Sequence, residues 1–120
     1  MSDLDSRDVE LEVSSANAAA ANNQTLAGVA SRTTYITGFS VTGAGATAGS
    51  VIAVTITGLA NTLTYYVTIP AGAGVGVTPL TVEFSRPLPA SAQNTAIVVN
   101  VPSFGAGNTQ AAATARGFQR

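Results

Sequence analysis

The chain has 120 residues, of which 46% are hydrophobic and only 9% are charged, whereas charged residues make up roughly 25% of an average soluble domain. This length suits one domain, and the sequence contains no Cys, His, Lys or Trp. These absences exclude a disulfide framework, the usual zinc, haem and iron–sulfur sites, and any reaction that needs a thiol, an imidazole or a lysine amine.

The charges are divided unevenly along the chain, which suggests two parts. Five of the six acidic residues lie in the first twelve positions, with Arg7 as the only basic residue among them. Residues 1–31 continue with four alanines, 18–21, and with polar residues, and they show no apolar stripe that would dock a helix on a core. We therefore predict an acidic, Ala-rich N-terminal arm over residues 1–31, extended or partly helical and ordered mainly by a partner. The alternative is a disordered leader without a role.

The body, residues 32–120, has the alternation of apolar and polar residues that is typical of β-strands. The expected strands lie at 34–41, 52–57, 65–69, 80–84, 97–101 and, more weakly, 112–118. Segments rich in Gly, Pro and Asn separate them. Five or six short strands of this kind predict an all-β fold, a single antiparallel β-sandwich or small barrel that is jelly-roll-like and carries the extended arm.

The body has few large apolar side chains and an unusually uncharged surface. Fifty consecutive residues between Arg32 and Glu83 carry no charge. Thin cores are often supported by oligomerisation, and uncharged strand edges do little to discourage pairing. We therefore expect a symmetric homo-oligomer or a permanent docking surface rather than an isolated monomer.

No pattern in the sequence indicates catalysis, a cofactor or a metal site. The segment 43–48 (GAGATA) fits a relaxed dinucleotide-binding fingerprint, but a predicted strand follows it where that motif needs a helix. Glu83 is the only acidic side chain of the body, and with Arg86 it is expected to form a surface ion pair. The scattered arginines form no basic patch for nucleic acid. No apolar run reaches the length of about 18 residues that a membrane span needs. We expect a non-enzymatic protein made in a cytoplasm.

Several segments of the body resemble small virion structural proteins of tailed bacteriophages, of the capsid decoration or cement type. The resemblance covers about residues 31–119 and does not include the arm. Its segments are 33–39 (TTYITGF), 54–59 (VTITGL), 94–99 (NTAIVV) and 101–109 (VPSFGAGNT).

This resemblance implies a non-enzymatic cement protein on the outer capsid surface, where it would bridge capsomers of the phage head. Its partner would be the major capsid protein, and a homotrimer is the favoured oligomer. The charge distribution agrees independently: the acidic arm beside the weakly basic body is expected to lie across neighbouring subunits, with its acids meeting basic patches on the shell or on an adjacent copy. Such electrostatics mainly sets the rate and orientation of contacts. The candidate partner-binding residues are Asp3, Asp5, Asp8, Glu10, Glu12, Arg32, Arg86 and Arg116.

Two other functions remain open on the sequence alone. The chain could be a tail or head-fibre component that binds surface glycans, with Tyr65, Tyr66, Asn61 and Asn94 as candidate contacts. It could also be an adhesin or surface-layer module of a cell, although its acidic beginning does not resemble a secretion signal.

Overall fold

The computed structural model describes residues 8–16, 20–46, 48–72, 74–105 and 110–120. Within these ranges the chain forms eight β-strands and no helix. The strands are β1 (Val9–Ala16), β2 (Gln24–Leu26), β3 (Thr34–Ala44), β4 (Ser50–Thr57), β5 (Leu63–Ile69), β6 (Leu80–Pro89), β7 (Ile97–Asn100) and β8 (Gln110–Gln119).

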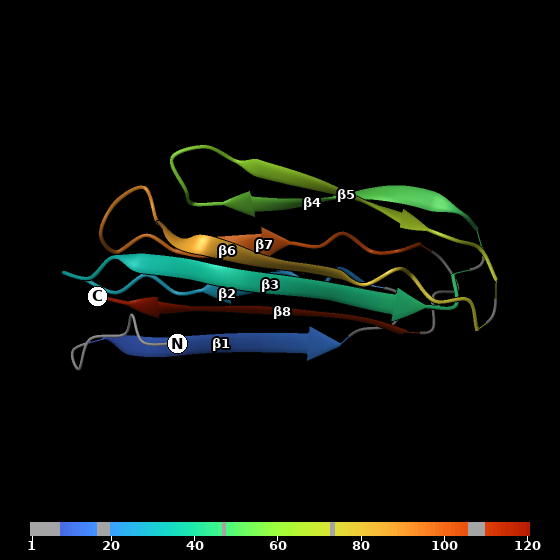
Figure 1. Ribbon diagram of the computed structural model, residues 1–120, viewed down its shortest axis with the longest axis horizontal. Coiled ribbons are helices and arrows are strands. Elements are labelled where there is room, and N and C mark those ends of the chain that lie inside the picture. The colour runs from blue at the N-terminus through green and yellow to red at the C-terminus, as the bar shows by residue number, and fades with distance from the viewer. Residues whose placement is uncertain (1–7, 17–19, 47, 73, 106–109) are drawn as a thin grey trace.

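The strands form two antiparallel sheets of four strands each, stacked in two layers (Figure 1). One sheet has the order β1-β8-β3-β6 and the other the order β2-β7-β4-β5. We call the first the charged sheet and the second the uncharged sheet, since no strand of the second carries a charged residue. Apart from the β4–β5 hairpin, each connection crosses from one sheet to the other. This is an eight-stranded jelly roll, so the predicted β-sandwich is confirmed.

The core lies between the two sheets and follows the period-two alternation of the sequence. In β4 the side chains of Ile52, Val54 and Ile56 are buried, while the residues between them face outward. The same alternation buries Val67 and Ile69 in β5. Branched side chains of this size each contribute about 1.5–3 kcal/mol when fully buried, so these faces hold the layers together.

The C-terminal strand is longer and more central than the sequence suggests. It runs from Gln110 to Gln119 and pairs with β1 on one side and with β3 on the other. Its core face consists of small residues, with Ala111, Ala113 and Ala115 all buried. Such residues give a weak strand signal because β-propensity is highest for branched and aromatic side chains.

The described part of residues 1–31 belongs to the sandwich and does not lie outside it as an arm. β1 pairs with β8 over its whole length, and β2 pairs with β7 in the other sheet. Leu26 is only 1% exposed and forms part of the core. The physical reason is the alternation of Leu11 and Val13, which pack against the core, with the outward acids of β1. Residues 1–7 and 17–19, which include Ala18 and Ala19 of the alanine run, lie outside the described residues.

A β-bulge and a close backbone contact lie where the two central strands of the charged sheet, β3 and β8, pair near one end of the sandwich. The register of β3 shifts between Ile36 and Gly38 in its pairing with both β6 and β8. On β8, a Cβ atom at Gly117 would overlap the carbonyl oxygen of Tyr35. The absence of a side chain at position 117 therefore allows β8 to approach β3 at the bulge.

We predict that Gly117→Ala lowers the free energy of unfolding by about 1–3 kcal/mol, because the added methyl group forces the paired backbones apart. Urea unfolding followed by circular dichroism measures this change. Gly76→Ala is the matched control, since no heavy atom lies within 4 Å of the position of its Cβ. Equal stability of the two variants would contradict the close approach of β8 to β3.

Candidate functional site

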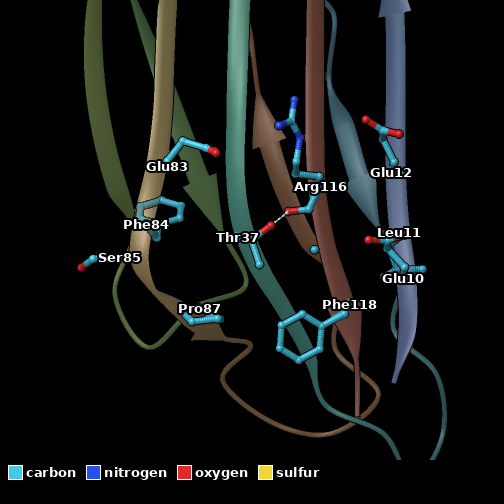
Figure 2. Close-up of a pocket in the computed structure, with 11 residues that line it drawn as sticks. Glu10, Leu11, Glu12, Thr37, Glu83, Phe84, Ser85, Pro87, Arg116 and Phe118 are labelled. Atoms are coloured by element: carbon cyan, nitrogen blue, oxygen red, sulfur yellow. Dashed lines mark hydrogen bonds between the residues drawn. The ribbon is translucent and has the colours of Figure 1, made fainter. Parts of the chain in front are cut away.

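The outer face of the charged sheet contains a groove of about 530 Å³ near one end of the sandwich (Figure 2). Outward side chains from all four strands of the sheet line it. Three carboxylates, one guanidinium group, two hydroxyl groups and two aromatic rings contribute to the lining, from Glu10, Glu12, Glu83, Arg116, Thr37, Ser85, Phe84 and Phe118.

The register of the strands places the main charges in a single row across the sheet. Glu12 on β1 lies opposite Arg116 on β8, which lies opposite Gly38 on β3, and Gly38 lies opposite Glu83 on β6. Gly38 has no side chain to fill the space between Arg116 and Glu83. The Oε2 atom of Glu83 lies 3.6 Å from the position that a Cβ of Gly38 would occupy. The bare backbone of Gly38 therefore lets the Glu83 carboxylate lie over β3, where a side chain at position 38 would meet it.

An aromatic pair lies in the neighbouring row of the same face. Glu10 is opposite Phe118, which is opposite Tyr35. The rings of Phe118 and Tyr35 are stacked, with their centroids 4.9 Å apart and their planes 14° apart. The guanidinium carbon of Arg120 lies 5.2 Å from the centroid of the Phe118 ring, a favourable cation–π distance. One end of the groove is therefore apolar and firmly packed.

The charged side chains of the groove lie more than 4 Å from any opposite charge among the described residues. No ion pair in the described ranges involves Glu10, Glu12, Glu83 or Arg116. The Thr37 hydroxyl donates a hydrogen bond of 3.1 Å to the main-chain carbonyl of Arg116, which leaves the guanidinium group uninvolved (Figure 2). The site thus has three carboxylates and one guanidinium group that form no ion pair among the described residues.

Asp8 has a different role, because it forms an internal ion pair with Arg120. Nε and Nη2 of Arg120 donate to the two carboxylate oxygens of Asp8, each at 2.9 Å. The Asp8 side chain is fully buried, whereas the Arg120 side chain is 44% exposed. This two-point contact fastens the start of β1 to the end of β8.

The structure brings together only some of the predicted partner-binding residues. Glu10, Glu12 and Arg116 line the groove. Arg32 and Arg86 do not line it, and Arg32 accepts a hydrogen bond from the Asn94 amide through its main-chain carbonyl. Asp3 and Asp5 lie outside the described residues.

Sequence reasoning missed Glu83, Thr37, Ser85 and Phe118 as parts of one site. The surface ion pair expected between Glu83 and Arg86 is not among the ion pairs of the described ranges, and the side chain of Glu83 borders the groove. Only the strand register, with its shift in β3, brings these residues to one face. No local motif could have indicated the site.

The four candidate glycan contacts do not form a shared surface. Tyr65 packs edge-on against the core residue Phe39, with ring centroids 5.3 Å apart. Tyr66 faces the opposite way and is 76% exposed on the outer face of the uncharged sheet. Asn61 and Asn94 are exposed in the loops that follow β4 and β6. Only Tyr66 is available as an aromatic platform.

Among the described residues, no group of three or more His, Cys, Asp or Glu side chains is arranged to hold a metal ion. In the same ranges, no helix is long and apolar enough to cross a membrane.

Comparisons with known proteins do not assign a family or a function to this chain. No protein-family model matches the sequence, and no curated protein matches it either.

We predict a coupling energy of about 0.5–1 kcal/mol between Asp8 and Arg120, because the pair is partly exposed on the arginine side. A double-mutant cycle with Asp8→Ala and Arg120→Ala, measured by urea unfolding, gives this value. The coupling should decrease as the salt concentration rises. Additive effects of the two substitutions at low salt would show that the contact does not hold β1 to β8.

Proposed function

We propose that this protein is a non-enzymatic structural protein of a virion, a cement or decoration protein that stabilises a phage head by bridging capsomers. Its partner would be the major capsid protein, on the outer surface of the capsid. The observation that carries the proposal is the groove on the charged sheet, where Glu10, Glu12, Glu83 and Arg116 have no ion-pair partners within the described chain.

The composition of the groove favours a protein partner with basic side chains. Three carboxylates surround one guanidinium group, so the lining is acidic on balance. Charges at the rim of an interface set the orientation and the association rate of a complex. Leu11, Phe84 and Pro87, which are half-buried in the lining, offer apolar contact at the same place. A basic loop of a capsid subunit would meet both kinds of contact.

The division of the molecule into two faces supports a fixed position in an assembly. The charged sheet carries the groove, whereas the uncharged sheet exposes threonines, Val51 and Tyr66. A freely diffusing domain usually carries mixed charges over its whole surface. Jelly rolls also occur in viral capsid proteins, which agrees with the proposal at the level of the fold alone.

The side chains of the groove support a binding role rather than a catalytic one. The sequence supplies no His, Cys or Lys, so a hydroxyl group there could be activated only by a carboxylate. The Thr37 hydroxyl donates to a main-chain carbonyl and not to a carboxylate. No cofactor is needed for the proposed role.

The exposure of Tyr66 favours one alternative, a tail or head-fibre component that binds surface glycans. Its ring is 76% exposed, and Thr64 and Thr68 project from the same face of β5. Aromatic rings with nearby hydrogen-bonding groups suit a sugar ring. This alternative uses the uncharged sheet and not the groove, so one experiment can separate the two functions.

We predict that the protein co-sediments with capsids that lack it, saturably and at a fixed ratio to the major capsid subunit. That ratio also tests the homotrimer expected from the resemblance. The triple variant Glu10→Gln, Glu12→Gln, Glu83→Gln should bind about tenfold more weakly at low salt, because each lost rim charge contributes a few tenths of a kcal/mol or more.

The matched control is Thr25→Gln, which introduces the same amide group at an exposed position of β2 on the uncharged sheet. It should bind capsids like the unmodified protein. Equal binding of the triple variant and the control would remove the groove from the interface. Absence of capsid binding, together with retention on a glycan-coated surface that Tyr66→Ala abolishes, would replace the cement function by the glycan-binding one.

A further inference from the structure

The two sheets have four edge strands, and three of them carry features that prevent pairing with another chain. β1 bears the acids Glu10 and Glu12, β2 has only three residues, and β6 contains Pro87 and Pro89. Charges, prolines and short length are the usual protections of an edge strand. β5 has none of them, since its sequence LTYYVTI contains neither a charge nor a proline.

The outer edge of β5 forms no backbone hydrogen bond with another described segment, and residues 78–80 line a pocket beside its second half together with Tyr66 and Thr68. β5 pairs with β4 along its whole length, from Leu63 opposite Ile56 to Ile69 opposite Ser50. None of the other backbone hydrogen bonds of the described residues involves β5. Beside this edge, Tyr66 is 76% exposed and Val51 is 63% exposed, and both project from the outer face of the uncharged sheet. An unprotected sheet edge with apolar side chains next to it is a typical site for pairing with a strand of another chain.

We propose that β5 pairs antiparallel with β5 of a second copy of this chain, about a twofold axis through Tyr66. The strand reads nearly the same in both directions: an aliphatic residue at each end, Thr at the second and sixth positions, and Tyr or Val at the third and fifth. In this register Leu63 meets Ile69 of the other copy, and Thr64 meets Thr68.

This register preserves both faces of the sheet. Thr64, Tyr66 and Thr68 face outward in each copy, while Tyr65 and Val67 face the core, so like surfaces meet across the axis. The two Tyr66 rings become direct cross-strand neighbours, and such aromatic pairs are among the more favourable ones. No charge faces another charge. The uncharged sheets of two molecules would join into one continuous sheet through an isologous contact.

The β5 pairing does not depend on the capsid-binding function. It gives a dimer with twofold symmetry, whereas the resemblance implies a homotrimer. A dimer through β5 leaves the groove on the charged sheet open for another partner. The absence of cysteine from the sequence permits a direct test of the register, because each introduced thiol is the only one in the chain.

In the proposed register, Tyr66→Cys should form a disulfide-linked dimer under mild oxidation. Directly opposed residues have Cα atoms about 4.5–5.5 Å apart, which suits a disulfide. Thr64→Cys is the matched control on the same strand and face. Its two thiols would be about 13 Å apart along the strand direction, so this variant alone should not cross-link. A mixture of Thr64→Cys and Thr68→Cys proteins should give the mixed dimer.

Light scattering of the unmodified protein, at the concentration of the cross-linking experiment, should give twice the chain mass of 11.9 kDa. Circular dichroism confirms that each cysteine variant is folded. A mass of one or three chains would overturn the β5 pairing, and three would agree with the trimer instead. Equal cross-linking of Tyr66→Cys and Thr64→Cys would also overturn it, because the register would then be unspecific. Capsid binding is measured in a separate experiment, so the cement function can be contradicted without the β5 pairing, and the β5 pairing without the cement function.

Discussion

The pairing of β8 with β1 on one side and with β3 on the other holds the charged sheet together. β8 can occupy this position because its core face is built from small residues, Ala111 to Ala115 in alternation, followed by Gly117. A larger side chain at position 117 would overlap the backbone of Tyr35. The sandwich therefore depends on the absence of bulk in its last strand, and the larger side chains of β3, β4 and β7 fill most of the core.

The same constraint shapes the candidate site. The bulge next to Gly38 accommodates an extra residue in β3 and places Thr37 against the Arg116 carbonyl. The bare backbone at Gly38 then lets the Glu83 carboxylate lie over β3, in the row that contains Arg116. Bulges commonly redirect side chains next to functional sites. The groove is thus a consequence of how three strands fit together, and its charges occupy positions that the register determines.

Much of the fold could be predicted from the sequence, because β-branched residues alternate clearly in β4 and β5, where Ile52, Val54 and Ile69 are buried as expected. β1 was harder to recognise, since its acids dominate the composition and hide the alternation of Leu11 and Val13. The groove could not be predicted in the same way. Its row joins residues more than a hundred positions apart, Glu12 and Arg116, and no local pattern encodes a register over that distance.

The antiparallel pairing of β1 with β8 also determines how the molecule bears mechanical load. Val9 lies opposite Gln119, and the Asp8–Arg120 ion pair closes this end of the ladder. A force that pulls the start of β1 away from the end of β8 loads one residue pair at a time, so the hydrogen bonds between the two strands break in sequence. A force spread over the outer face of a sheet is shared by four strands at once. The sandwich is therefore suited to resist pressure across its faces and yields most easily when it is pulled by its ends.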